Sequence, residues 1–157
     1  ESTLYQRFRL LTTISMSRTK EATIRPAWLE DYEGTFRLMD TLDTFHRERL
    51  PWMFKVPSEQ PRTERYFEHL LSGDDSSVFV AYAGYIVGIA VGLMRAAPDS
   101  PVFIQQRWGV LDGLVVDPAW RRRGIGKLLA GSVEACPRCG STARRSSLAT
   151  AAAKSAS

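Results

Sequence analysis

A short basic and glycine-bearing stretch near the end of the chain carries the residue types best suited to binding an anion. Residues 115–120 have the pattern of a strand end and tight turn, and residues 124–135 that of a helix. The residues that join this turn to the first turn of the helix include four cations and two glycines: Arg121, Arg122, Arg123, Gly124, Gly126 and Lys127. The first N–H groups of a helix have no intrahelical partner and lie at its positive end. No Ser, Thr, Asp or Asn precedes Gly124 to cap them, so the pattern predicts a helix start open to a phosphate group.

This stretch resembles the acetyl-CoA-binding motif of the GNAT acetyltransferase superfamily, which runs Arg/Gln-x-x-Gly-x-Gly/Ala from a strand into a helix. The motif here is Arg121-x-x-Gly124-x-Gly126, and the preceding Val-Asp-Pro-x-Trp is similar to the family's strand exit. The resemblance implies that residues 121–127 hold the pyrophosphate of acetyl-CoA, while a strand edge pairs with the pantetheine arm. The implied cofactor-binding residues are Leu114, Val115, Val116, Arg121, Arg122, Arg123, Gly124, Ile125, Gly126 and Lys127. Which arginine contacts phosphate is left open, and at least one is expected to face solvent.

The reaction that the resemblance implies is transfer of an acetyl group from the thioester to an amine. It needs a base to provide the amine in its neutral form, and a donor to stabilise the developing oxyanion. Asp112 is the candidate base, because in a regular strand its side chain shares one face with Leu114 and Val116. A solvated or salt-bridged carboxylate at a strand edge is the alternative for Asp112. A backbone N–H near Val116 is the candidate oxyanion donor.

Three further residues are candidates for the acceptor site: His46 at the end of the first helix, and Trp52 and Phe54 in a proline-rich segment. The alternatives are a surface or capping role for His46 and a satellite apolar cluster for the aromatic residues. The acceptor itself stays open among polyamines, aminoglycosides, amino acids and peptide or protein amines. Cys136 and Cys139 have the spacing of half a zinc site, but no second Cys or His pair follows, so no metal is expected.

Composition favours one soluble globular domain. The 157-residue chain has a net charge of +4, and residues 136–157 contain four cations and no acid, so the remaining chain is neutral. We therefore do not expect nucleic acid as a partner. The longest apolar run, about residues 86–94, is too short to span a membrane. Two cysteines and no signal-peptide pattern lead us to expect a cytoplasmic protein.

The elements that must position these residues follow an α+β order. Apolar residues recur at three- and four-residue steps over residues 28–45, which predicts a helix ending before Pro51. A second helix is predicted over residues 62–71 with Gly73 as its cap, followed by strands over 78–82, 85–95 and about 105–116. With a short β-leaning segment over residues 22–25 ahead of the first helix, this order matches the family's first four strands and three helices. We expect a GNAT-like mixed, mainly antiparallel sheet flanked by helices and incomplete at the C-terminus.

The chain divides into three expected regions. Residues 1–20 read as an N-terminal arm or an added segment, and residues 21–135 as a partial acetyltransferase-like domain. Residues 136–157 are a Ser/Ala/Arg-rich tail, expected to be disordered or out of frame because it has too little apolar area to fold. The family's later strands and the tyrosine general acid of its fourth helix have no counterpart.

Two hypotheses follow. The first is an N-acetyltransferase that uses acetyl-CoA and a primary amine of a small molecule or peptide. The second is a non-catalytic, truncated CoA-binding fragment that pairs with another chain through its exposed sheet edge. That edge leads us to expect a homodimer, with a strand swap between the two copies as one way to form it.

Overall fold

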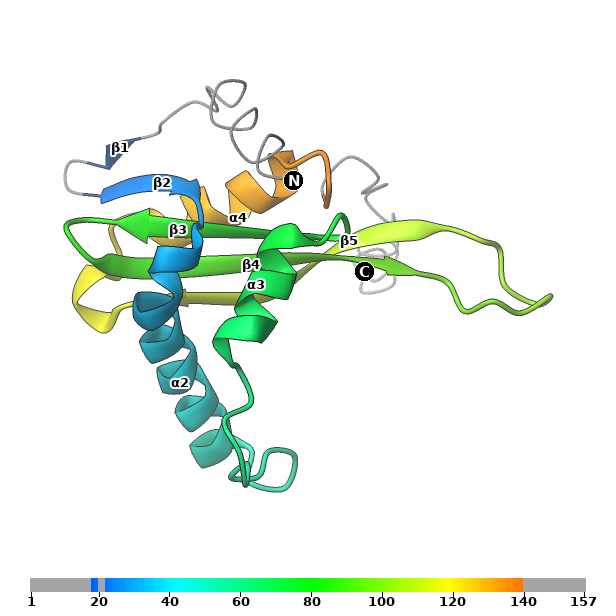
Figure 1. Ribbon diagram of the computed structural model, residues 1–157, viewed down its shortest axis with the longest axis horizontal. Helices are drawn as coiled ribbons and strands as arrows, with labels where there is room; N and C mark the ends of the chain where they lie inside the picture. Colours follow the sequence, from blue (N-terminus) through cyan, green and yellow to red (C-terminus); the bar gives the residue numbers. More distant parts are fainter. Residues whose placement is uncertain (1–17, 20–21, 140–157) are drawn as a thin grey trace, which may run out of the picture.

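In the part of the chain that the computed structural model describes, residues 18–19 and 22–139, five antiparallel strands form one sheet with helices on both faces (Figure 1). The strands are β1 (Arg18–Thr19), β2 (Ala22–Pro26), β3 (Ser76–Tyr82), β4 (Ile86–Ala96) and β5 (Arg107–Val116), and they lie side by side in chain order. The helices are the short 3-10 helices η1 (Leu29–Asp31) and η2 (Pro118–Trp120), and α2 (Tyr32–Arg49), α3 (Glu64–Ser72) and α4 (Ile125–Ala135). The α+β class and the mainly antiparallel sheet are confirmed. The expected arm, apart from Arg18 and Thr19, and the expected tail beyond residue 139 lie outside the described residues.

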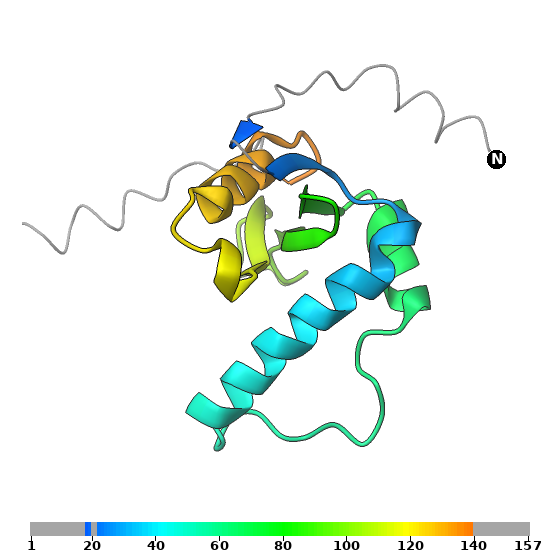
Figure 2. The ribbon, with the colours of Figure 1, turned by 90° about the vertical axis from the view of Figure 1, so that its left-hand side faces the viewer.

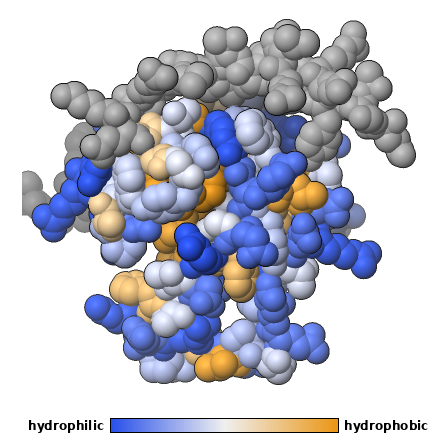
Figure 3. Space-filling view, turned by 60° about the vertical axis from the view of Figure 1, so that its left-hand side comes forward, coloured by the Kyte–Doolittle hydropathy of each residue, from blue (hydrophilic) through white to orange (hydrophobic). Residues whose placement is uncertain are grey.

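The sheet separates two apolar clusters, because side chains along a strand point alternately to its two faces. On one face Val78 and Val80 pack with residues of α2 and α3, including Leu38 and Phe67. On the other face the strands pack against α4. Figure 2 shows α4 on one side of the sheet and α2 and α3 on the other. On the face drawn in Figure 3, hydrophobic residues lie largely recessed between hydrophilic side chains.

The helices on the first face begin and end close to the predicted positions. η1 precedes α2, which starts at Tyr32 and ends at Arg49, before Pro51. α3 is capped at its start by Thr63, whose hydroxyl accepts a hydrogen bond from the Tyr66 N–H at 3.2 Å. Gly73 ends α3, but in an extended conformation (φ −68°, ψ 139°) rather than the left-handed one common for glycine caps. No helix within the described residues is long and apolar enough to cross a membrane.

Two glycines of β4 allow α4 to lie close to the sheet. A Cβ on Gly92 would stand 2.5 Å from a methyl carbon of Val133, and one on Gly88 would stand 3.0 Å from a methyl carbon of Leu129. The glycines at these strand positions therefore make room for the α4 side chains.

The regular alternation of β5 is interrupted at Asp112. Val91 of β4 pairs with Gly113, and the next residue of β4, Gly92, pairs with Leu111. Asp112 therefore has no partner on β4 and forms a β-bulge. A bulge of this kind shifts the side-chain phase of the bulged strand. Asp112 borders a cleft on the α2 side, whereas Leu114 and Val116 pack against the α4-side cluster. The prediction that these three side chains share one strand face is therefore wrong, because the strand is not regular there.

Candidate functional site

Residues 121–127, which we call the basic turn, lead from η2 into α4 with two residues in the left-handed backbone region. Arg122 has φ +62° and Gly124 has φ +80°. Glycine adopts this region at no steric cost, whereas an arginine there is strained. Gly124 is the N-cap of α4 and makes no side-chain capping bond. The first helical hydrogen bond runs from the Leu128 N–H to the Gly124 carbonyl at 3.1 Å, so the preceding N–H groups of the helix start stay open to a ligand.

Two of the three arginines are used to hold the basic turn itself. The Arg121 Nε donates a hydrogen bond to the Val116 carbonyl at 3.0 Å. The Arg123 guanidinium lies 4.7 Å from the ring centroid of Trp120. The indole N–H of Trp120 in turn donates a hydrogen bond to the Tyr85 hydroxyl at 2.8 Å. Arg122 and Lys127 are exposed. The turn is thus a backbone structure braced by the side chains of Arg121 and Arg123, and all four of its cations are exposed.

β5 is the edge strand of the sheet within the described residues, and its last residues offer open backbone groups. The Asp117 N–H bonds the Val87 carbonyl at 2.9 Å and so points toward β4. Backbone groups of successive strand residues point alternately to the two sides. Those of Val116 and Leu114 therefore point away from β4, while Val115 bonds β4 and buries its side chain under α2. Leu114 therefore offers both its N–H and its carbonyl at the edge, whereas Val116 offers only its N–H because Arg121 bonds its carbonyl. Val115 contributes packing.

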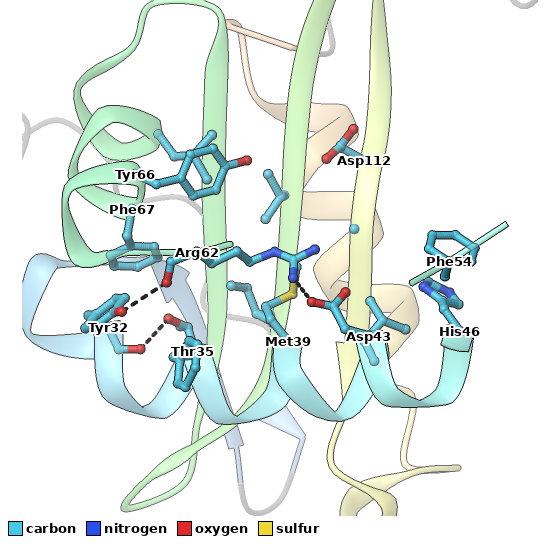
Figure 4. Close-up of a pocket in the computed structure, with 16 residues that line it drawn as sticks. Tyr32, Thr35, Met39, Asp43, His46, Phe54, Arg62, Tyr66, Phe67 and Asp112 are labelled. Atoms are coloured by element: carbon cyan, nitrogen blue, oxygen red, sulfur yellow. Dashed lines mark hydrogen bonds and ion pairs between the residues drawn. The ribbon is translucent and has the colours of Figure 1, made fainter. Parts of the chain in front are cut away.

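A cleft of about 290 Å³, which we call the α2–β5 cleft, lies between α2, α3 and the sheet (Figure 4). The residues of α2 that line it include Tyr32, Phe36, Met39, Leu42, Asp43 and His46. Phe54, Arg62, Tyr66 and Phe67 line it from the proline-rich segment and α3, and Ile89, Val91, Asp112 and Gly113 from the sheet. The cleft is therefore mostly apolar, and the Asp and Arg side chains among its lining residues are Asp43, Arg62 and Asp112.

An ion pair between Arg62 and Asp43 crosses the cleft and joins the proline-rich segment to α2 (Figure 4). Both side chains are largely buried, with 31% and 22% of their surface exposed. The Tyr32 hydroxyl donates to the Arg62 carbonyl at 3.0 Å and accepts from the Gln60 amide at 2.7 Å. These contacts fix the segment that closes one side of the cleft.

The bulge brings Asp112 to the sheet side of the cleft. Its carboxylate is 41% exposed and lies 3.4 Å from the guanidinium of Arg95, which is also exposed. Contact between exposed charges at this distance is weak. Asp112 therefore keeps a solvated carboxylate beside an apolar cleft, an arrangement open to accepting a proton from a bound amine.

Two of the three predicted acceptor residues line this cleft. His46 stacks on Phe54, with ring centroids 5.0 Å apart and the planes at 21°, and both border the cleft with Asp112. Trp52 does not line it, and 77% of its surface is exposed. The sequence interpretation missed Arg62 and Tyr66, and assigned Phe36 and Met39 to a core stripe. Asp43 within that stripe and His46 at its end were the available signals of a polar function on this face of α2.

Of the two cysteines with the spacing of half a zinc site, Cys139 is buried and Cys136 is partly buried. Both thiols are free. Burial raises the pKa of the Cys139 thiol, so this thiol stays protonated and unreactive near neutral pH. Within the described residues, no group of three or more His, Cys, Asp or Glu is placed to hold a metal ion.

Known proteins with the same architecture are found by sequence and by structure. The acetyltransferase (GNAT) family model matches residues 38–155. A single-site mutant of the BH1408 protein from Bacillus halodurans is 26% identical, with 70% of this chain and 71% of that chain covered and a TM-score of 0.62. An acetyltransferase from Vibrio fischeri is 22% identical, with 71% and 82% covered and a TM-score of 0.55. Glucosamine-6-phosphate N-acetyltransferase from Arabidopsis thaliana is 20% identical, with 72% and 71% covered and a TM-score of 0.51. The last two similarities concern the fold alone, and no curated protein matches the sequence.

Proposed function

Because the chain belongs to the acetyltransferase (GNAT) family, we propose that it transfers the acetyl group of acetyl-CoA to a primary amine of a small molecule or peptide. One feature of the structure carries this proposal. The open helix start, the open backbone edge of β5 and the carboxylate of Asp112 follow one another along residues 112–127. A cofactor with a phosphate end and a strand-like arm would lie along that path with its reactive end at the α2–β5 cleft.

The residues of the basic turn fit the phosphate end of acetyl-CoA. The N–H groups of Ile125, Gly126 and Lys127 are proposed to donate to phosphate oxygens, as helix starts commonly do. A Cβ on Gly124 would meet nothing within 4 Å, so the approach to the helix start is open. The exposed Arg122 and Lys127 add positive charge, while Arg121 and Arg123 hold the turn.

The edge of β5 fits the amide-containing arm. Leu114 directs its N–H and carbonyl away from β4, and Val116 directs its N–H the same way, which lets an extended partner hydrogen-bond as a strand would. The Val116 carbonyl already accepts from Arg121. Val115 keeps this segment in place by burying its side chain. The arm would then deliver its thioester toward the bulge at Asp112.

Acetyl-CoA supplies an acetyl group activated as a thioester. The neutral amine attacks its carbonyl carbon, a carbon–nitrogen bond forms and the carbon–sulfur bond breaks, with the thiolate leaving. Asp112 is proposed to accept the proton that the amine gives up, directly or through water. A backbone N–H near Val116 is proposed to stabilise the oxyanion.

Acetyl-CoA should raise the melting temperature, and thiol should be released from acetyl-CoA only when an amine is present. Desulfo-CoA and ATP serve as controls, since they share parts of the cofactor but carry no acetyl group. Absence of both the melting shift and the thiol release would count against the proposal.

The open edge of β5 also favours the second candidate, a non-catalytic CoA-binding protein that forms a homodimer through that edge. In this case acetyl-CoA raises the melting temperature, no amine releases thiol, and sedimentation shows a dimer. A monomer with turnover would rule out this second function.

A further inference from the structure

The walls of the α2–β5 cleft are dominated by apolar side chains. Phe36, Met39 and Leu42 line it from α2, and Tyr66 and Phe67 from α3. Ile89 of the sheet, only 2% exposed, also lines it. Burying apolar area on such a surface is favourable, so the cleft favours a molecule with an apolar body.

The charges of the cleft leave room for one ammonium group. Asp43 is already neutralised by Arg62, and it is held in that pair inside the cleft. Asp112 has only the weak, exposed contact with Arg95. A second ammonium group on the same molecule would find no unpaired carboxylate among the lining residues and would be repelled by Arg62. Polyamines and aminoglycosides are therefore poorly matched to this lining.

Anionic acceptors are also poorly matched. Arg62 is the one Lys or Arg side chain among the lining residues, and Asp43 occupies it. A phosphate or carboxylate group would have to displace Asp43, breaking a largely buried pair. The volume of about 290 Å³ lies at the lower end of the range for small-molecule sites, which favours a small acceptor.

We propose that the acceptor is a small primary amine with one positive charge and an aromatic or branched aliphatic body. The ammonium group lies beside Asp112, and the apolar body lies along Phe36 and Met39. This inference rests on the proposed acetyl transfer, and it names the acceptor class that the same site takes.

A panel of amines tests the proposal with acetyl-CoA as donor. 2-Phenylethylamine and 3-methylbutylamine represent the proposed class, and spermidine, kanamycin, glucosamine 6-phosphate and alanine represent the others. We expect kcat/KM to be at least about tenfold higher for the first two. Preference for any of the other four overturns the specificity and leaves acetyl transfer intact. Failure of every amine, together with no melting shift from acetyl-CoA, defeats the proposed function as well.

Binding of 2-phenylethylamine, measured by calorimetry in the presence of desulfo-CoA, gives a second readout that needs no turnover. Weaker binding of 2-phenylethylamine than of spermidine contradicts the proposal even if no amine is acetylated. Tighter binding supports it.

Two phenylalanines of α2 provide a matched pair of variants. Phe36 lines the cleft, whereas Phe45 lies on the same helix outside it and is 50% exposed. Phe36→Ala should raise KM for 2-phenylethylamine about tenfold and leave KM for acetyl-CoA unchanged. Phe45→Ala should change neither. Phe36→Leu, which keeps an apolar side chain, covers the case in which the alanine variant does not fold. Equal effects of the variants at the two positions on KM for 2-phenylethylamine would refute the proposal that Phe36 contacts the apolar body of the acceptor.

Discussion

The basic turn presents its polar groups through the backbone, whereas the α2–β5 cleft presents them through side chains. In the turn, the open N–H groups depend on the conformations of Arg122 and Gly124, and two arginines are occupied in holding that shape. In the cleft, the charged groups come from the middle of α2, the proline-rich segment and a bulge in β5. The first site is contiguous in the chain, and the second is assembled across about seventy residues.

This difference determines how each site responds to substitution. A site made of backbone groups tolerates changes of side chain but not changes that forbid its φ and ψ angles. A site made of side chains loses function with each group removed, yet the fold beneath it can stay intact. Substitutions in the two regions should therefore separate cofactor binding from chemistry and from acceptor choice.

The largest effect is expected from Asp112→Asn. Loss of a positioned base lowers a rate by about 100-fold or more, and we expect this loss in kcat. The melting shift produced by acetyl-CoA should persist, because Asp112 is exposed and lies outside the basic turn. The rate deficit should shrink as pH rises, because more of the free amine is then already neutral. Initial rates of thiol release over a pH series measure the loss of kcat and its dependence on pH.

Asp40→Asn is the control for this substitution. Asp40 is an exposed carboxylate of α2 that does not line the cleft. An equal loss of kcat in both variants would show that negative charge near α2, rather than Asp112 as a base, supports the rate.

The next effect tests the backbone site. Gly124→Ala places a Cβ at φ +80°, which should cost about 1 kcal/mol of unfolding free energy and weaken acetyl-CoA binding about tenfold. Gly131→Ala is the matched control, because Gly131 lies inside α4 with nothing within 4 Å of its would-be Cβ. Gly131→Ala should stabilise the protein by about 1 kcal/mol and leave the affinity unchanged. Calorimetric titration and thermal melting separate the two, and equal affinity in both variants would argue against a ligand at the helix start.

The basic turn could be predicted from sequence because its determinants are local. The strand end, the absent cap and the helix start all lie within residues 114–127, and the structure has strand, turn and helix in that order. The edge position of β5 follows from the order of the strands. The sequence did not show which arginines brace the turn, because the spacing of residues does not determine their side-chain contacts.

The cleft could not be predicted to the same degree. Arg62 and Asp43 are nineteen positions apart, and no sequence period relates them. The bulge at Asp112 depends on how β5 pairs with Val91 and Gly92 of β4. The alternation within β5 alone therefore placed the Asp112 side chain on the wrong face of the sheet. Periodicity correctly identified α2, but it did not show which of its apolar residues line the cleft: the buried side chains of α2 are Thr35 and Leu38, whereas Met39 and Leu42 border the cleft.

A smaller effect tests how the cleft is held together. Asp43→Asn breaks the largely buried pair with Arg62 and should cost about 1–2 kcal/mol of unfolding free energy. Asp75→Asn removes the same kind of pair with Arg107, but both of those side chains are more than half exposed, so the cost should be below about 0.5 kcal/mol. Urea denaturation measures both. Equal costs would mean that the cleft-crossing pair is no more than a surface contact.

The smallest effect separates backbone from side chain at one position. Arg122→Ala and Arg122→Gly both remove the guanidinium, but only glycine relieves the strain of φ +62°. Relief of this strain should raise the unfolding free energy of the glycine variant above that of the alanine variant by about 1 kcal/mol. The greater conformational entropy that glycine gives the unfolded chain offsets part of this difference. Acetyl-CoA affinity should fall by no more than about threefold in either variant, because an exposed cation contributes little beside open N–H groups. A loss of about thirtyfold or more in both variants would show that the Arg122 side chain holds the phosphate, and the basic turn would then be a side-chain site like the cleft.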